Sequence, residues 1–363
     1  MTTVAPQPIR TQPVSSVSGW RAYCDQVSDL VRPRPMSWSE YRNLSSVARG
    51  QYDEARLRWL LMGLIIGTDE QKKSATLLRT IMRENRMRGT GEQALLVSGE
   101  PPLGKTTLAK KLGRLVEAQQ AKDHPDYRRD GIVPVVYADA PSNGSGKQLL
   151  AALDSFSHGG ARPARTTQED LLRYVIETIH ALRVRLLIVD EAHLLSEQQR
   201  AAQDPTDILK QIQNATPATV LIAGIDLLDP AGLATRRGAQ LLDRAEPLEM
   251  TSFTATTAES RMYWEAVLDA FDSALPLIDH EPGLFVANQQ LIHDATRGSI
   301  GLLNKLVARL VGSMVDDPDR TDERVTPAKL DEALLMIANA ARADKKLGKA
   351  KRGGTLVGGR RAS

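Results

Sequence analysis

The stretch that decides the fold is Gly99-Glu100-Pro101-Pro102-Leu103-Gly104-Lys105-Thr106-Thr107. Its residues 99–106 form a complete G-x-x-x-x-G-K-[ST] loop, in which backbone N–H groups surround phosphate oxygens at a helix N-terminus. The Lys105 ammonium is expected to reach the β- and γ-phosphates of a nucleotide, and the Thr106 hydroxyl to hold Mg²⁺. The apolar run Ala94–Ser98 before the loop and the amphipathic run Lys105–Ala118 after it predict the strand and the helix that this motif requires.

A second motif, Leu186-Leu187-Ile188-Val189-Asp190-Glu191, runs from apolar residues into two carboxylates. A buried strand of this kind delivers Asp190 to the Mg²⁺ site, and Glu191 can polarise a water for in-line attack on the γ-phosphate. The predicted strand Ile132–Ala138 lies between the two motifs, so the strand before the loop and the strand of Asp190 are not expected to be neighbours in the sheet. This order is typical of additional-strand ATPases. Because the sequence has no guanine-reading Asn-Lys-x-Asp, ATP is favoured over GTP.

From about residue 92, short apolar strands alternate with longer amphipathic helices, which predicts a parallel sheet covered by helices on both faces. The expected strands are Ala94–Ser98, Ile132–Ala138, Arg185–Asp190, Thr219–Gly224 and Ala245–Met250. After Phe253 only helical patterns follow, so the predicted fold class is α/β: a P-loop domain with a five-stranded parallel sheet, plus a small all-helical C-terminal lid. The expected boundaries are a disordered terminus at 1–18, an aromatic and helical segment at 19–90, the α/β domain at 91–253, the lid at 254–342 and a basic flexible tail at 343–363.

The composition excludes several other classes. With 363 residues, 42% of them hydrophobic and 25% charged, the chain suggests about two folded units and is neither disordered throughout nor a collagen-like or disulfide scaffold. Cys24 is the only cysteine, so no intrachain disulfide can form. No apolar run approaches the ~20 residues of a membrane span, and the N-terminus lacks the layout of a signal peptide. We therefore expect a cytoplasmic protein without membrane contact.

The net charge of +3 is unevenly distributed along the chain. Residues 341–363 contain eight Lys or Arg against one Asp and carry +7, which leaves −4 on residues 1–340. Such a tail fits a polyanion partner, because Lys and Arg side chains displace counterions from phosphates. A solvated tail that only aids solubility is an equal alternative.

Aromatic residues are concentrated near the N-terminus, where Trp20, Tyr23, Trp38 and Tyr41 lie among prolines and polar residues. They are too many for a solvated linker. They can pack on the body of the protein or form an arm that docks a partner, and the sequence leaves both open.

A third motif, Gln240-Leu241-Leu242-Asp243-Arg244-Ala245, directly precedes the last predicted strand. In ring-forming ATPases an arginine at this helix end points into the nucleotide of the neighbouring subunit and stabilises charge that develops on the γ-phosphate. We assign this role to Arg244, with Arg236 and Arg237 as weaker candidates. The alternative is an arginine that pairs with Asp243 or Glu246 on a solvated face.

Together these features resemble the AAA+ regulators of transposition, the TnsC/TniB group, which is related to MuB and IstB and close to the replication-initiator clade. The resemblance covers about residues 55–340. It rests on both nucleotide motifs, on the position of Arg244 and on three further blocks, which are Val189-Asp190-Glu191-Ala192-His193-Leu194-Leu195, Ala223-Gly224-Ile225-Asp226 and Ala295-Thr296-Arg297-Gly298-Ser299-Ile300-Gly301-Leu302-Leu303. It implies ATP and Mg²⁺ as cofactors and a ring or helical filament of identical subunits with ATP between them. Double-stranded DNA, a transposase and a target-selection adaptor are the implied partners.

Two positions depart from the AAA+ pattern. The polar sensor that normally ends the fourth strand is replaced by Asp226, whose carboxylate would repel a γ-phosphate unless a water or metal lies between them. The lid arginine, expected three residues after Gly298, is Gly301; Arg297 and Lys305 lie on neighbouring turns. We therefore expect Asp226 and Arg297 to contact the nucleotide. The protein is expected to be a slow ATPase whose turnover needs assembly or a partner, as suits a switch.

The resemblance also places DNA contacts in the polar turn 142–147, where Lys147 is the candidate for a phosphate contact. The tail offers further candidates, namely Lys345, Lys346, Lys349, Lys351 and Arg352. One alternative function is a nucleotide-gated protein-interaction switch or remodeller that does not bind DNA. Another is a replication initiator or helicase loader, although the tail is too short for the winged-helix domain that such proteins usually carry.

Overall fold

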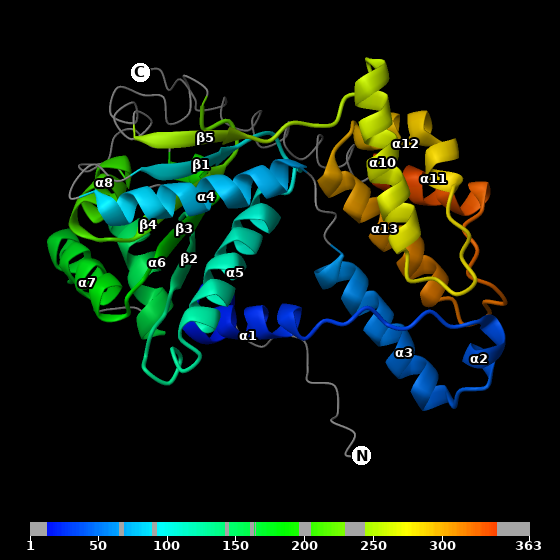
Figure 1. Cartoon of the computed structure of the whole chain (residues 1–363), viewed down its shortest axis with the longest axis horizontal. Coiled ribbons are helices and arrows are strands. Elements are labelled where there is room, and N and C mark those ends of the chain that lie inside the picture. The colour runs from blue at the N-terminus through cyan, green and yellow to red at the C-terminus, as the bar shows by residue number, and fades with distance from the viewer. Residues whose placement is uncertain are drawn as a thin grey trace, which may run out of the picture. The chain divides into compact units, whose positions relative to one another are not determined.

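The computed structural model describes residues 13–64, 69–88, 93–141, 145–159, 163, 165–195, 205–228 and 244–339 (Figure 1). The chain divides into two compact units. The first comprises Met1–Asp29 and Gly67–Thr251, and the second comprises Leu30–Ile66 and Ser252–Ser363. Throughout the described ranges, no helix has both the length and the apolar character needed to cross a membrane.

A five-stranded parallel sheet forms the centre of the first unit, in the order β2-β3-β4-β1-β5. Its strands are β1 (Ala94–Ser98), β2 (Val135–Asp139), β3 (Leu186–Asp190), β4 (Thr219–Gly224) and β5 (Ala245–Glu249). Every residue of β1, β3 and β4 is buried, as expected for central strands of a parallel sheet. β4 lies between β1 and β3, which confirms that the strand before the phosphate loop and the strand of Asp190 are not neighbours.

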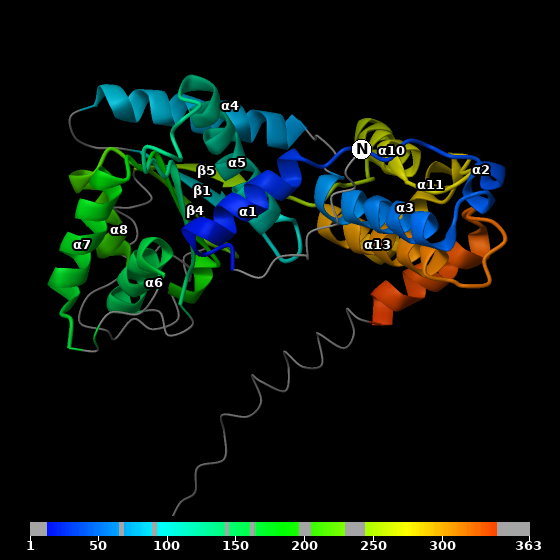
Figure 2. The ribbon, with the colours of Figure 1, turned by 90° about the horizontal axis from the view of Figure 1, so that it is seen from below.

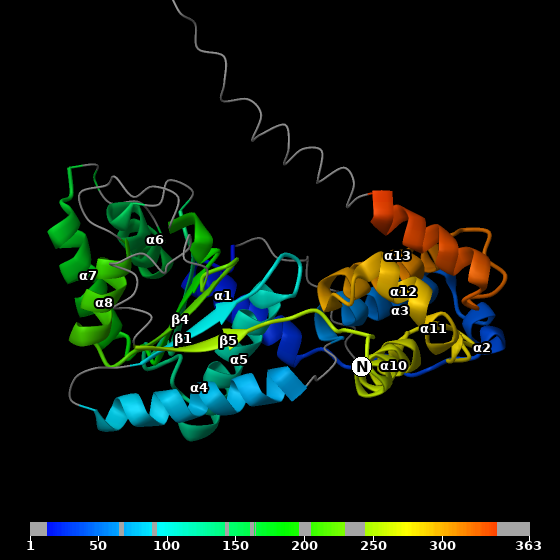
Figure 3. The ribbon, with the colours of Figure 1, turned by 90° about the horizontal axis from the view of Figure 1, so that it is seen from above.

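Helices cover both faces of this sheet, as predicted. Figures 2 and 3 show α4 and α5 on one face and α6, α7 and α8 on the other. Their bounds are α4 (Asp69–Met87), α5 (Lys105–Asp123), α6 (Gly146–His158), α7 (Gln168–Ala181) and α8 (Pro205–Ala215). α5 buries Leu108, Leu112 and Val116 at helical spacing, so the helix that follows the phosphate loop is fixed on the sheet by its apolar face.

The second strand begins at Val135, later than the predicted start at Ile132. Pro134 explains the difference, because proline has no N–H to donate to a neighbouring strand. The N–H groups of Ile132 and Val133 donate instead to Tyr127 O and Leu182 O, which are outside the sheet.

Residues 13–18 are ordered, which corrects the expectation of a disordered terminus over 1–18. The Ser16 hydroxyl caps α1 (Val17–Ser28) by accepting from the Gly19 N–H at 3.1 Å, and Val14 is 7% exposed. This first helix packs through Trp20 against α5. Residues 1–12 lie outside the described part of the chain.

The second unit is all-helical and is formed by two separate parts of the sequence. Its first part contains α2 (Trp38–Arg42), α3 (Ser46–Arg58) and the π-helix η1 (Trp59–Gly63). Its second part contains α10 (Ala258–Ala274), α11 (Leu284–Ala287), α12 (Gln289–Thr296), α13 (Ile300–Val315) and a helix at 327–339. The core of the unit includes Trp264, Phe271, Phe285 and Leu306, each fully buried. Residues 19–90, expected as one N-terminal segment, are thus divided between the two units.

A buried ion pair explains why α3 belongs to the helical unit. The Arg56 guanidinium, 1% exposed, donates to the carboxylate of Glu323, which is fully buried, and to that of Asp53 on its own helix. A buried guanidinium needs such partners, because an unpaired charge in the interior is strongly destabilising. Tyr41, 5% exposed, donates its hydroxyl to Asp53, so this aromatic residue packs inside the unit.

Candidate nucleotide site

The phosphate loop connects β1 to α5, and its two glycines use backbone conformations that other residues rarely adopt. Gly99 has φ +151°, and a Cβ there would lie 2.5 Å from Met250 O. Gly104, the N-cap of α5, has φ +90°. A Cβ at Gly104 would have open space around it. Apart from its chain neighbours and its own helix, no heavy atom of the described residues lies within 4 Å of that position. Space therefore remains at the helix N-terminus, and the loop fits a nucleotide phosphate.

The Lys105 side chain lies within this loop. Its Nζ donates to Gly99 O at 2.8 Å and to Glu100 O at 2.9 Å. Burial lowers the pKa of Lys105, and the negative charges of Glu191, Asp190 and Asp226 oppose that shift. The loop of Lys105 follows β1, Asp190 and Glu191 stand at the end of β3, and Asp226 follows β4, so the parallel sheet places all four at the same edge. Thr106 and Thr107 follow in the first turn of α5.

The acidic motif places one buried and one open carboxylate side by side at the end of β3. Asp190 is 2% exposed; its Oδ2 accepts from the Tyr137 hydroxyl at 2.8 Å, and its Oδ1 accepts from the Glu191 N–H at 2.9 Å. The Glu191 side chain is 47% exposed and lies 3.3 Å from His193 Nδ1. A rigid carboxylate suits a metal ligand, whereas one open to solvent suits a group that orients water. Among the described residues, no cluster of three or more His, Cys, Asp or Glu could hold a metal.

Two close contacts hold the turns around the acidic motif. Gly224, at the end of β4, has no room for a side chain, because a Cβ would lie 2.9 Å from His193 N. Asp226 follows in the left-handed region at φ +47°, and the next residue, Leu227, donates its N–H to Ser98 Oγ at 3.0 Å. Sequence reasoning missed Ser98 and Tyr137. The one feature of the sequence that could have indicated them is a hydroxyl group within a largely apolar strand, β1 for Ser98 and β2 for Tyr137.

Arg244 lies at the opposite edge of the sheet from the phosphate loop. Its carbonyl accepts from the Ala94 N–H at the start of β1, whereas the loop begins after Ser98 at the other end. At ~3.3 Å per residue, the length of β1 separates them by about 16 Å, farther than an arginine side chain extends. Its Nη1 donates to Asn214 Oδ1 at 3.0 Å, and Asp243, one of the two acids considered from the sequence, lies outside the described residues.

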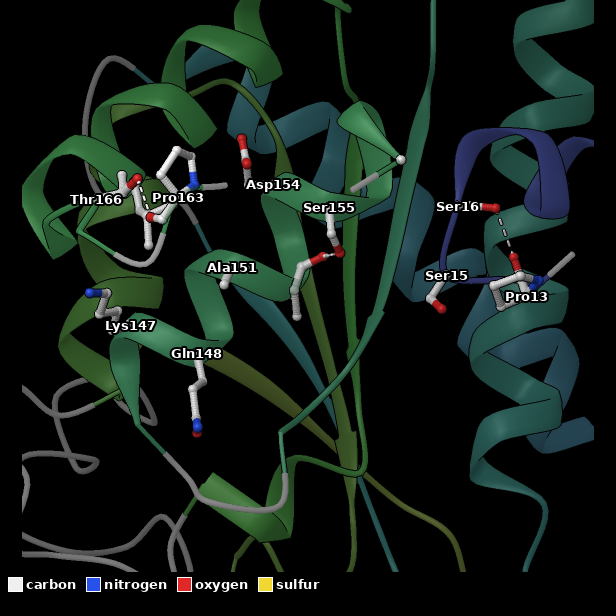
Figure 4. Close-up of a pocket in the computed structure, with 13 residues that line it drawn as sticks. Pro13, Ser15, Ser16, Lys147, Gln148, Ala151, Asp154, Ser155, Pro163 and Thr166 are labelled. Atoms are coloured by element: carbon white, nitrogen blue, oxygen red, sulfur yellow. Dashed lines mark hydrogen bonds between the residues drawn. The ribbon is translucent and has the colours of Figure 1, made fainter. Parts of the chain in front are cut away.

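The remaining predicted contact residues lie in the second unit, on α6 or outside the described part. Arg297 and Lys305 are exposed in the second unit, and Arg297 ends α12 with φ +52°. Lys147, in the first turn of α6, is exposed and lines a cavity of about 600 Å³ across from Pro13 and Ser16 (Figure 4). The described residues that line this cavity do not include the phosphate loop. Arg236, Arg237 and the tail residues fall outside the described ranges.

The strand order, the phosphate loop and the adjoining acidic pair define an AAA+ ATPase fold. The chain belongs to the TniB family, because the family model described as bacterial TniB protein matches residues 56–255. A search of curated proteins gives no match.

Two solved structures from Aeropyrum pernix are similar in fold. The ORC2 protein, solved as ADPNP-ADP complexes, is 16% identical with a TM-score of 0.56, over 76% of this chain and 71% of that chain. The ORC1 protein, solved in complex with DNA, is 17% identical with a TM-score of 0.54, over 77% of this chain and 69% of that chain. At this level of identity the likeness shows the shared fold.

Proposed function

We propose that this TniB-family protein is an ATP-dependent regulator of transposition. In this proposal it assembles on double-stranded target DNA and recruits or activates a transposase, with or without a target-selection adaptor. The observation that carries the proposal is that the phosphate loop with Lys105 and the carboxylates of Asp190, Glu191 and Asp226 adjoin the same edge of the sheet, in a chain of this family. The transposase and the adaptor follow from the family alone.

The residues of the site divide the chemistry among themselves. Bound ATP would supply the γ-phosphoryl group that is transferred to water, with ADP as the leaving group, and Mg²⁺ would neutralise charge on the phosphates. Lys105 and the N–H groups of the loop bind the phosphates, while Asp190 and Thr106 hold the ion. Glu191, open to solvent, orients the attacking water and accepts its proton. Asp226 contacts this site through a water, because direct contact with a phosphate would be repulsive.

The place of Arg244 supports the proposed assembly. Because it cannot reach its own phosphate loop, it acts on the loop of a neighbouring subunit, and ATP then favours the ring or filament. Each subunit offers its loop at one end of the sheet and its arginine at the other, so the contact is head-to-tail and can propagate. Hydrolysis removes the phosphate that Arg244 stabilises and thereby releases the assembly.

Duplex DNA is the proposed substrate of this assembly. A filament that lies on many sequences must read phosphates and helix shape, so the contacts are cationic. Lys147, exposed at the start of α6, is one candidate, and the basic tail residues Lys345, Lys346, Lys349, Lys351 and Arg352 are others. The solved complex of ORC1 with DNA supports the proposal, because that protein has the same fold.

The test is binding of a labelled duplex in the presence of ATP, ADP or no nucleotide, each at two salt concentrations. Binding that requires ATP and weakens with salt supports the proposal. Equal binding in all three conditions contradicts it. Absence of DNA binding together with ATP-dependent capture of a protein partner would favour the protein-interaction switch. Lys105→Ala should abolish the ATP effect, and Lys122→Ala, an exposed lysine at the other end of α5, is its matched control.

A further inference from the structure

Tyr137 connects the acidic motif to the N-terminal helix. It lies on β2 opposite Ile188 of β3, and its side chain extends along the sheet to Asp190, where the hydroxyl donates to Oδ2 at 2.8 Å. Its ring stacks on that of Trp20 from α1, with centroids 6.0 Å apart and planes 12° from parallel. Tyr137 and Trp20 are each 1% exposed, so both contacts are inside the unit.

The two hydrogen bonds to Asp190 fix the orientation of its carboxylate. The Glu191 N–H binds Oδ1 and the Tyr137 hydroxyl binds Oδ2, so rotation of the carboxylate would break both bonds. Each oxygen keeps a second lone pair that can face a metal ion or a water. The hydroxyl also lies 3.1 Å from Asp139 Oδ1, but its single proton favours the shorter contact. Burial and the nearby carboxylates raise the pKa of Tyr137 far above its usual range, so the hydroxyl remains a donor.

The position of the Trp20 side chain is fixed by its contacts with α5. Its Nε1 donates to Glu117 Oε2 at 3.2 Å, and the buried Glu117 carboxylate also accepts from the Tyr127 hydroxyl at 2.6 Å. The indole passes over Gly113, where a Cβ would lie 2.7 Å from Trp20 Cη2. The Trp20 side chain therefore docks α1 on α5 by a hydrogen bond and by close packing. The Trp20 ring in turn supports the ring of Tyr137.

We infer that Tyr137 is a positioning residue for the Mg²⁺ ligand Asp190, and that docking of α1 through Trp20 controls Mg²⁺-dependent nucleotide binding. The inference rests on the proposed function, which makes Asp190 a Mg²⁺ ligand. Residues that orient a metal ligand typically change metal affinity or activity by 10–100-fold when they are removed. α1 ends at Ser28, and the second unit begins at Leu30, so the chain passes into the second unit directly after α1. A partner that displaces this helix would thus weaken nucleotide binding without touching the phosphate loop.

Tyr137→Phe tests the first half of the inference, because it removes one oxygen and keeps the stacked ring. The Kd of a fluorescent ATP analogue is measured in EDTA and across a Mg²⁺ titration. We expect the Mg²⁺ midpoint to rise about tenfold while the Kd in EDTA stays the same. Tyr41→Phe is the matched control, since that buried hydroxyl donates to Asp53 in the second unit. An unchanged midpoint in Tyr137→Phe would overturn the role of Tyr137.

Trp20→Leu tests the second half. We expect the same rise in the Mg²⁺ midpoint, with Trp38→Leu as the control, because Trp38 stacks on Tyr41 in the second unit as Trp20 stacks on Tyr137. A folded Trp20→Leu protein with the wild-type midpoint would overturn the part assigned to α1. If Trp20→Leu fails to fold, Trp20→Phe loses both the bond to Glu117 and the indole atoms that pack on Gly113, and a wild-type midpoint there would overturn that part. Wild-type protein that binds no nucleotide in Mg²⁺ would instead contradict the proposed function itself.

Discussion

The position of Arg244 predicts that its charge acts only on a neighbouring subunit. About 16 Å of β1 lies between it and its own loop, at ~3.3 Å per residue. Arg244→Ala and Glu191→Gln should each lower turnover, the former by about 10³-fold or more if Arg244 stabilises the γ-phosphate. In a 1:1 mixture of the two variants, a contact between subunits is active only when an Arg244→Ala subunit supplies the site with its intact Glu191 and a Glu191→Gln subunit supplies the arginine. Random mixing gives about one such contact in four, so the mixture should regain about a quarter of wild-type turnover.

Steady-state phosphate release with saturating duplex DNA measures this recovery. Arg244→Ala mixed with a chain that carries both substitutions should stay inactive, because no subunit then supplies the arginine. Asn214→Ala removes the same local hydrogen bond without removing the cation, and it should keep turnover near the wild-type value. A 1:1 mixture no more active than its separate components would refute the action of Arg244 between subunits.

Three other predictions concern the site and the second unit. Lys105→Ala should lose nucleotide binding in equilibrium titrations while Lys122→Ala keeps it, and retained affinity in the former would refute the assignment of the loop. Glu191→Gln should bind ATP normally but leave it intact, so that dissociation from duplex DNA slows; unchanged turnover would remove Glu191 from its role. Glu323→Gln removes one of the two carboxylates that pair with the buried Arg56 and leaves only Asp53, which should lower the stability of the second unit by about 3 kcal/mol. Urea unfolding followed by helical circular dichroism measures the loss, and a wild-type midpoint would contradict it.

The nucleotide site could be predicted from the sequence because its residues are local to short motifs. The loop at 99–107 and the pair Asp190 and Glu191 each lie where a strand ends, and the edge of a parallel sheet brings such ends together. One predicted strand between the motifs was enough to show that their two strands are not neighbours in the sheet. The boundary error at Ile132 arose because apolar character outweighed the effect of Pro134 in the prediction.

The features of the fold and the site that the sequence did not predict depend on contacts between residues far apart in the chain. Arg56 meets Glu323 across 267 positions, and this contact decides that α3 joins the helical unit. Tyr137 meets Asp190 across 53 positions, and Glu117 meets Trp20 across 97. Each of these contacts satisfies a buried polar group, and nothing in the local sequence pattern indicates which partner will do so.

The most direct measurement is the mass of the protein with and without a long duplex, in ATP·Mg²⁺, in ADP·Mg²⁺ and in EDTA, by mass photometry or electron microscopy. Assembly of many subunits on the duplex in ATP·Mg²⁺, and its loss in the other two conditions, is the predicted result. A protein that stays monomeric on and off the duplex when saturated with ATP·Mg²⁺ would contradict an ATP-bridged assembly on DNA.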